Sequence, residues 1–404
     1  MEYTLALGGG TLDVLYSHRE IQPDWWNDLH ITDCYHTEPW IKLGESRFEQ
    51  DSRYIAVKDG SGRIQALAPC CRIRDPQIWP TYNLWKLFTK ASFIQFEDLP
   101  GIDHAKFSTN AEYIDAAVGD KLFPNLICTA PEGFMTGPMY AYGLSPETIN
   151  TVNTSIVDGL KQLGEELECA ASSLLYVMED SPIRSYLDQT DWIPMQMNPM
   201  AILDIKWKSF DEYLSSLSRK RRESTRREMK KFKESGMIVK QERLEDLPID
   251  RTAELFHNVN AKHMGFDAGP VQHARYYIEG LLGLGLTHTV YAAYQNENLV
   301  AFSLFFLQDN TLFARVMGID YERATDYSYF NLLFYRPIID AIEQGVACID
   351  FGGMLKAKLI RGCKPHRSFS YFKFGSEVCK DAQAIRAMRE NADIISRYHD
   401  LVVS

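Results

Sequence analysis

The chain has 404 residues, of which 45% are hydrophobic and 24% are charged, and its formal net charge is −11. These proportions are typical of globular proteins and exclude disordered and fibrous classes, while the length predicts two or three domains. A chain this acidic does not bind nucleic acid over its whole surface, so any polyanion site must be local.

The N-terminal stretch and the cysteines indicate a cytoplasmic location. The first residues lack the basic and long apolar regions of a signal peptide, and no apolar run is long enough to span a membrane. The eight cysteines are dispersed, contain no CxxC pair, and include adjacent Cys70 and Cys71, which do not readily form an ordinary disulfide. We therefore expect reduced thiols. The oligomeric state stays open.

Two β-hairpins of similar sequence are predicted far apart in the chain. The first, YIAVKDGSGRIQALAPCCRI, begins at Tyr54, and the second, YAAYQNENLVAFSLFFLQ, begins at Tyr291. Tyr54 corresponds to Tyr291 and Ala66 to Ala301, with the second turn two residues shorter. The pattern indicates an internal duplication, with chance similarity of two short hairpins as the alternative.

Helix and strand patterns between and after the hairpins predict an α+β arrangement. Residues 149–180 indicate a helix leading into a strand, residues 198–205 indicate another strand, and a second domain is expected to begin at residue 206. The second hairpin is followed by a strand over 311–320 and a helix over 328–344. We expect Pro337 to kink that helix near Leu333 and Gly345 to end it. A strand over 346–353 and a closing helix over 380–404 complete the prediction.

The segment RKRRESTRREMKKFK, residues 219–233, concentrates positive charge. Nine basic and two acidic residues give it +7, so the rest of the chain carries −18. A solvated helix face is the ordinary interpretation of such a run. A helix over 211–235, however, has a buried stripe marked by Leu214, Leu217 and Phe232. Arg221, Thr225 and Glu228 lie on the same stripe, so Arg221 should point inward.

Arg222 and Arg226 flank that stripe one turn apart, a spacing suited to binding phosphate or carboxylate oxygens. A second basic segment, DFGGMLKAKLIRGCKPHRSFSYFKF, covers residues 350–374. It places Asp350 at a strand end, two glycines where backbone can approach a ligand, and Lys358 and Arg361 shortly after them. We interpret it as an anion-binding loop, with an ordinary basic surface loop as the alternative. The histidines show no spacing typical of a metal site.

These segments together resemble the FemAB-like family, a branch of the GNAT superfamily associated with peptidoglycan biosynthesis or recognition. The run SFDEYLSSLSRKRRESTRREMKKFKESGM is similar to the family's F-x-x-Y-L-x-x-L-x-x-R-K-R helix start, and KLIRGCKP is similar to its K-L-x-R-G-x-x-P loop. TLFARVMGID, which contains Arg315, resembles the family's strand ending in an Arg and a Gly. YFNLLFYRPIIDAIEQG resembles the following helix, and LFPNLICTAPEGFMTGP resembles a Pro-rich segment ending in T-G-P.

The resemblance implies an α/β (α+β) fold of two tandem GNAT-like domains, which we place at residues 1–205 and 206–404. It also implies acyl transfer, and in well-understood Fem relatives an amino acid moves from aminoacyl-tRNA to an amine of a cell-wall precursor. After VMGID, acetyl-CoA enzymes carry a glycine-rich R-x-x-G-x-G/A turn, whereas this chain reads YERATDYSYF without glycine. Acetyl-CoA is therefore doubtful as the donor, and we predict no resident cofactor and no metal.

The resemblance further suggests a distribution of roles. Lys358 would stabilise the oxyanion formed when an amine attacks an ester carbonyl, and Asp350 would orient Lys358 or accept the amine's proton, with a capping role as the alternative for Asp350. Substrate-binding roles are predicted for five arginines: Arg221, Arg222, Arg226, Arg315 and Arg361. The expected partners are an anionic small molecule or a tRNA-linked substrate. An acyl-CoA-dependent N-acyltransferase and a non-catalytic module that binds an anionic precursor are the alternatives.

Overall fold

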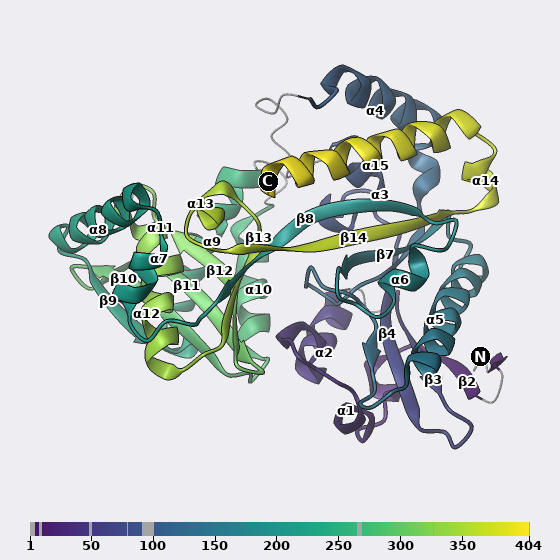
Figure 1. The fold of residues 1–404 in the computed structure, drawn as a ribbon, viewed down its shortest axis with the longest axis horizontal. Helices are drawn as coiled ribbons and strands as arrows, with labels where there is room; N and C mark the ends of the chain where they lie inside the picture. The colour runs from purple at the N-terminus through teal and green to yellow at the C-terminus, as the bar shows by residue number, and fades with distance from the viewer. Residues whose placement is uncertain are drawn as a thin grey trace. The chain divides into compact units, whose positions relative to one another are not determined.

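The computed structural model describes residues 5–7, 10–47, 51–78, 80–90, 101–264, 269–325 and 327–403. It divides into two compact units (Figure 1). Unit 1 comprises residues 1–31, 35–199 and 366–404, and unit 2 comprises residues 32–34 and 200–365. The junction between residues 199 and 200 lies near the boundary that we expected at residue 206. Residues 366–404, which we expected in the C-terminal domain, belong instead to unit 1.

Unit 1 is built on a sheet in the order β1-β2-β3-β4-β5-β7-β14-β8, with β6 paired to β4. β5 and β7 are parallel, whereas the pairs from β1 to β5 are antiparallel. The strands are β1 (Leu5–Leu7), β2 (Gly10–Leu15), β3 (Ser52–Lys58), β4 (Ile64–Ile73), β5 (Asn125–Cys128), β6 (Met139–Tyr140), β7 (Ala171–Met178), β8 (Ile193–Asp204) and β14 (Lys364–Phe374).

Helices cover both faces of this sheet (Figure 1). The C-terminal helix α15 joins α3 and α4 in one apolar cluster, which explains why residues 366–404 belong to unit 1, and α5 packs in a second cluster with β2, β3 and β7. The helices are α1 (Trp25–Asp28), α2 (Glu38–Arg47), α3 (Leu84–Thr89), α4 (His104–Val118), α5 (Pro146–Glu166), α6 (Arg184–Leu187), α14 (Ser376–Cys379) and α15 (Ala382–Val403), with short 3-10 turns at His18–Glu20, Cys34–His36, Pro80–Tyr82 and Asp120–Leu122.

Unit 2 has the strand order β9-β10-β11-β12-β13, and the end of β8 pairs with β13. β12 and β13 are parallel and the other pairs are antiparallel. The elements are α7 (Phe210–Ser216), α8 (Arg219–Glu234), β9 (Ile238–Glu242), a 3-10 turn (Leu244–Asp246), α9 (Ile249–Met264), α10 (Val271–Leu282), β10 (His288–Gln295), β11 (Asn298–Gln308), β12 (Thr311–Ile319), α11 (Ser328–Phe330), α12 (Arg336–Gln344), β13 (Cys348–Gly353) and α13 (Lys356–Leu359).

The same plan therefore recurs in both units. An antiparallel hairpin, β3–β4 or β10–β11, leads to a parallel pair of strands, β5 and β7 or β12 and β13, joined through a helix. The pairing register corrects one detail of the expected repeat. Ala56 faces Leu67 and Ala293 faces Ala301, so Leu67 rather than Ala66 is equivalent to Ala301.

The expected interruption of the helix over 328–344 is a π-helical turn, Asn331–Tyr335. The Arg336 N–H bonds to the carbonyl of Asn331, five residues back, just before Pro337, which has no N–H to donate. Gly345 ends α12 in the left-handed conformation, with φ of 70°, as the sequence predicts. Among the residues that the structure describes, no helix has the length and apolar character needed to cross a membrane.

Candidate functional site

The basic segment forms two helices rather than the single expected helix over 211–235. Ser209 caps α7 by accepting the Glu212 N–H, and Ser218 caps α8 by accepting the Arg221 N–H. Leu217, between them, has extended backbone and ends α7. Because α8 begins at Arg219 as a separate helix, its orientation does not follow from that of α7 and depends on the residues that α8 itself buries.

The inner face of α8 is the one that the periodicity predicts. Thr225 is fully buried, and Glu228 and Phe232 are buried with it. The side chain of Arg221 is 13% exposed, so it also points inward. A helix of very low hydrophobicity thus buries a threonine, a glutamate and an arginine, and each buried charge requires a partner.

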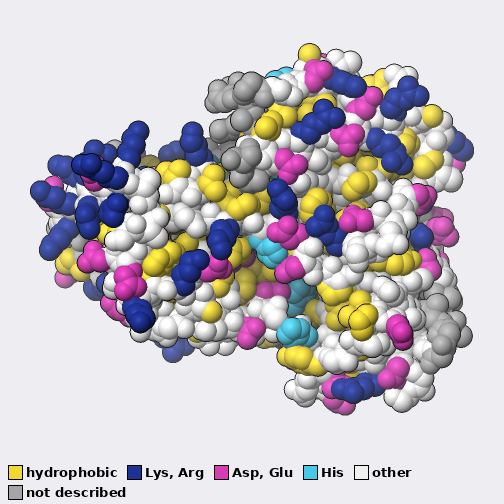
Figure 2. All heavy atoms as spheres, viewed as in Figure 1, with side chains coloured by type: hydrophobic (Ala, Val, Ile, Leu, Met, Phe, Trp, Pro, Cys, Tyr) yellow, Lys and Arg dark blue, Asp and Glu magenta, His cyan; other side chains and the backbone are white. Residues whose placement is uncertain are grey.

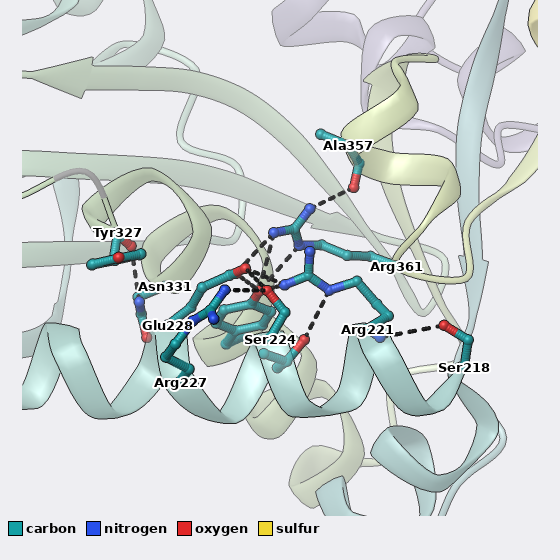
Figure 3. Close-up of polar contacts among 11 residues, drawn as sticks. Ser218, Arg221, Ser224, Arg227, Glu228, Tyr327, Asn331, Ala357 and Arg361 are labelled. Atoms are coloured by element: carbon teal, nitrogen blue, oxygen red, sulfur yellow. Dashed lines mark hydrogen bonds and ion pairs between the residues drawn. The ribbon is translucent and has the colours of Figure 1, made fainter.

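Glu228 is the centre of a buried ionic network in unit 2 (Figure 3). Its carboxylate accepts hydrogen bonds from Tyr335 Oη, Arg221 Nη2, Arg361 Nη2 at 3.0 Å and Ser224 Oγ at 2.8 Å. Burial would by itself raise the pKa of Glu228, but the hydrogen bonds from Tyr335, Arg221 and Ser224 outweigh it and hold the pKa below its ordinary value. The carboxylate is therefore ionised and fixed between two guanidinium groups.

Arg361 lies deeper than Arg221 and is only 1% exposed. Its Nη1 donates to the carbonyl of Ala357 at 2.7 Å, and its Nε donates to Tyr335 Oη at 3.2 Å. The guanidinium carbon also lies 4.0 Å from the centre of the Phe330 ring. Arg361, predicted to bind substrate, is thus placed in the interior, where its charge is used to hold Glu228 and the α13 backbone.

Lys358 is also buried, in α13. Its Nζ donates to the carbonyls of Phe351 at 2.5 Å and Gly353 at 2.6 Å. Burial lowers the pKa of Lys358 to about 8, although the charge of Asp350 opposes this shift. Asp350 is buried within β13 rather than at the strand end that the sequence predicts, and it accepts the Gly352 N–H at 2.7 Å. Both predicted catalytic groups therefore bind backbone groups of the last three residues of β13.

The remaining predicted arginines have three different surroundings. Arg222 is half-buried, and no hydrogen bond or ion pair of its side chain is found among the residues described. Arg226 is exposed and lies 3.7 Å from Asp211. Arg315, on β12, donates from Nε to Tyr277 Oη at 2.5 Å. Arg315 therefore does not belong to the network around Glu228.

The second basic segment is not one loop. It consists of the end of β13, the short helix α13 and the strand β14, and its distal cations are paired with acidic side chains. The pairs are Lys364–Asp204 at 2.8 Å, His366–Asp180 at 3.2 Å and Arg367–Asp400 at 3.6 Å. Only the part around α13 lies against α8.

An open pocket of about 550 Å³ lies where α8 begins and α13 ends. One side is polar, with Lys220 and Arg221, and the other is apolar. The lining residues are Ser216, Leu217, Ser218, Lys220, Arg221, Ser224, Leu359, Ile360 and Gly362. Gly362 has a φ of 88°, so the turn after α13 favours glycine. The structure thus joins the two segments that the sequence selected separately, and this pocket is the candidate site.

Glu228, Tyr335 and Ser224 were not among the predicted site residues. The inward position of Glu228 on α8 was visible in the sequence, because a glutamate on a buried stripe needs cationic or hydrogen-bonding partners. Tyr335 gave no such signal, since its hydroxyl reaches Glu228 only through the π-helical turn and the packing of α8 on it.

In the turn after β12, the side chain of Asp320 accepts hydrogen bonds from backbone amides of the same turn. Asp320 Oδ1 accepts the N–H groups of Glu322 at 3.0 Å and Arg323 at 3.2 Å, and Asp320 Oδ2 accepts Arg251 Nη2 at 2.5 Å. Burial opposes ionisation of Asp320, but these hydrogen bonds lower its pKa. A carboxylate therefore occupies backbone amides of this turn.

Comparisons with known proteins show the family of this chain. The model of the FemAB-like family, described as peptidoglycan biosynthesis/recognition, matches residues 106–401. No match is found among curated proteins.

Three solved structures are similar over most of their length. FemX has a TM-score of 0.55 at 12% identity, covering 92% of this chain and 99% of its own. The C-terminal domain of a protein from Agrobacterium fabrum, assigned as a lysylphosphatidylglycerol synthetase, has a TM-score of 0.51 at 11% identity, covering 89% and 92%. A tandem GNAT protein from the clavulanic acid biosynthesis pathway has a TM-score of 0.44 at 9% identity, covering 90% and 98%. The match to the family model and the likeness to FemX confirm the predicted Fem-type α/β fold.

Proposed function

This chain belongs to the FemAB-like family, and on that premise we propose that it is an acyltransferase that forms an amide bond. The preferred donor is an aminoacyl-tRNA and the acceptor is an amine. The observation that carries the proposal is the pocket at the start of α8, where Lys220 and Arg221 face an apolar wall of Leu217, Leu359 and Ile360. Its volume is in the range of small-ligand sites.

The pocket combines the groups that an activated acyl donor requires. Cations and serine hydroxyls suit a phosphate, and the apolar wall suits an acyl side chain or a base. Arg221 is the most fixed of the cations, because it donates to Glu228, which Arg361 in turn holds in place. We propose that Arg221 contacts the ligand, that Glu228 and Arg361 are positioning residues, and that Arg222 and Arg226 attract the anion from outside the pocket.

The turn after β12 supports a donor other than CoA. A pyrophosphate needs free backbone amides and a favourable potential at such a turn. Here the Asp320 carboxylate accepts the amides of Glu322 and Arg323 and adds a negative charge. FemX and the Agrobacterium fabrum protein, the latter named for a lysyl-containing product, share the fold. We therefore favour an aminoacyl ester.

The reaction we propose is aminolysis of that ester. The amine nitrogen attacks the carbonyl carbon, the C–N bond forms, and the ester C–O bond breaks through an oxyanion intermediate. The proton lost by the amine ends on the departing hydroxyl of the tRNA ribose. Lys358 donates to the carbonyls of Phe351 and Gly353, so we assign it and Asp350 to holding the end of β13 rather than to the oxyanion itself.

One observation favours the non-catalytic alternative, a module that binds an anionic precursor. Neither Lys358 nor Asp350 lines the pocket, so no described acid or base of the predicted pair reaches a ligand there. The two proposals differ in whether any product forms.

Mass spectrometry of candidate amines incubated with a mixed aminoacyl-tRNA pool tests the proposal. We expect a product heavier than the amine by one aminoacyl residue, and no acetylated product when acetyl-CoA replaces the pool. Acetylation would overturn the choice of donor. Absence of any product from either donor, with the protein folded and binding tRNA, would favour the binding module.

Lys358→Met and Lys364→Met separate a direct from a positioning role for Lys358. A direct oxyanion role predicts a loss in kcat of about a hundredfold with the melting temperature unchanged. A positioning role predicts that kcat and melting temperature fall together. Lys364, exposed and paired with Asp204, should leave both unchanged.

A further inference from the structure

Basic side chains gather over α8 (Figure 2, dark blue at the left). Of the nine basic residues of this helix, only Arg221 belongs to the buried network. The other eight are Arg219, Lys220, Arg222, Arg226, Arg227, Lys230, Lys231 and Lys233. The side chains of Arg219 and Lys230 are 88% and 75% exposed. We call these eight residues the outer face of α8.

The acidic residues beside this face do not neutralise it. Glu223 lies 3.0 Å from Arg219, Asp211 lies 3.7 Å from Arg226, and Glu234 lies 3.4 Å from Lys231. These pairs are exposed, and exposed pairs contribute little and exchange readily with other anions. Lys220, Arg222 and Lys233 form no ion pair with any described residue. The charge is therefore available to a partner.

The face is long and regular. Arg222, Arg226, Lys230 and Lys233 follow one another at intervals of four, four and three residues, so they form one row along the 16-residue helix. A single phosphate would need two or three cations at one point. A row of this length fits an extended polyanion, and the acidic remainder of the chain confines that partner to this helix.

An RNA backbone fits this surface better than a membrane. A helix that binds a bilayer inserts an apolar face between the headgroups. The apolar side of α8 is already buried, with Phe232 inside unit 2, and α8 has no exposed large hydrophobic residue. Phosphodiester groups need only cations.

The outer face also leads into the candidate site. Lys220 belongs both to this face and to the pocket lining, and Arg221, the next residue, is held by Glu228 inside the network. A polyanion bound along α8 would therefore have one end at the pocket. Resting on the proposed function, we propose that the outer face of α8 binds the phosphate backbone of the donor tRNA and that the acylated end reaches the pocket at the first turn of the helix.

The test uses a quadruple variant of the row, Arg222→Gln, Arg226→Gln, Lys230→Gln and Lys233→Gln. Glutamine has nearly the same helix propensity as lysine and arginine, so α8 should persist. The matched control replaces four exposed cations of unit 1, Arg74→Gln, Lys106→Gln, Lys121→Gln and Lys380→Gln. Both variants lose the same charge, and circular dichroism verifies that both are folded.

Fluorescence anisotropy with labelled, unacylated tRNA measures binding over a range of salt concentrations. We expect the row variant to bind at least about tenfold more weakly near physiological salt, and the slope of log K against log salt to shrink by about 3 units. The control should stay within about twofold of the unmodified chain. Equal losses in both variants, or no tRNA binding by the unmodified chain, would overturn the inference.

Two further outcomes separate this inference from the proposed function and from membrane binding. Product formation with an unchanged KM for aminoacyl-tRNA in the row variant would overturn the docking surface while the transferase stands. Binding of tRNA that depends on the row, without any product, would support the surface and contradict the transferase. Binding of vesicles containing anionic phosphatidylglycerol that is lost in the row variant while tRNA binding is retained would identify the surface as membrane-binding.

Discussion

A buried glutamate lies at the centre of a hydrogen-bond network in each unit, and the two networks differ in the partners they use. Glu45 in unit 1 accepts the His18 N–H at 2.5 Å, Tyr54 Oη at 2.8 Å and Ser17 Oγ at 2.8 Å. Those donors are neutral, and the His18 imidazole lies beside them, with its Nδ1 2.9 Å from Glu45 Oε1. Glu228 in unit 2 accepts two guanidinium groups as well as hydroxyls. Burial opposes ionisation of both, yet both pKa values lie below the ordinary one.

The cavities beside the two glutamates also differ. Glu45 borders a small, partly open cavity of about 30 Å³. Glu228 holds Arg221, which lines an open pocket of about 550 Å³. Neutral donors are sufficient to close a core, whereas a cation held at a pocket wall offers charge to a ligand. The difference indicates a structural network in unit 1 and a binding network in unit 2.

Removing the central carboxylate should have the largest effect and should separate the two networks. Glu228→Gln leaves Arg221 and buried Arg361 without their counter-charge, and we expect a loss of about 3 to 5 kcal/mol in the free energy of unfolding. Glu45→Gln weakens hydrogen bonds from neutral donors and the contact with the His18 imidazole, without leaving a buried guanidinium unpaired, and about 1 to 3 kcal/mol is expected. Urea unfolding at neutral pH measures both. Equal losses would contradict the distinction.

The pH dependence of stability tests Lys358, beside the second network. Its folded-state pKa of about 8 lies below the ordinary 10.5. Between these values the unfolded chain binds a proton that the folded chain has released, so the free energy of unfolding should rise with pH through this window, by up to about 3 kcal/mol. Lys358→Met should lack this rise. The measurement is urea unfolding at neutral and alkaline pH, with Lys364→Met as the control that keeps it.

Loss of the pocket cations should weaken ligand binding by a smaller amount. Arg221→Ala with Arg222→Ala removes charge-assisted hydrogen bonds, and a loss of about 1.5 to 3 kcal/mol in tRNA binding is expected. Arg63→Ala, an exposed arginine of unit 1 paired with Asp28, should leave affinity unchanged. Anisotropy titrations compare the two, and circular dichroism monitors folding because Arg221 also supports Glu228. Unchanged affinity in the double variant would indicate that α8 is an ordinary solvated helix with no role in binding.

The smallest expected effect is that of acetyl-CoA. Stabilisation by a ligand follows its concentration relative to the dissociation constant, and Asp320 occupies the amides that a pyrophosphate needs. We therefore expect little change in melting temperature when acetyl-CoA is added. A large, saturable rise at micromolar concentration would show that the turn after β12 rearranges to bind CoA, and the donor assignment would fall with it.

Local patterns predicted most of the fold. The two hairpins, the strand after the second, the Gly345 helix end and the C-terminal helix depend on alternation, periodicity and backbone conformation within a few residues, and the structure has each of them. The division into units was less accessible. Residues 366–404 join unit 1 because β14 pairs with β7 and α15 packs with α4, and neither contact leaves a mark in the local sequence.

In the candidate site, too, some features followed from the local sequence and others only from the tertiary structure. The sequence by itself determined that α8 is a basic helix with Arg221, Thr225 and Glu228 facing inward, because helical periodicity fixes which side chains share a face. It also selected the segment around Lys358 and Arg361. Only the tertiary structure decided that Arg361 and Lys358 are buried against Glu228 and backbone carbonyls rather than open to a ligand. The physical reason is that a buried charge takes the partners that packing brings to it. Glu228, the charged partner of Arg361, lies 133 residues away in the sequence, whereas the carbonyls that accept from Lys358 belong to the end of β13.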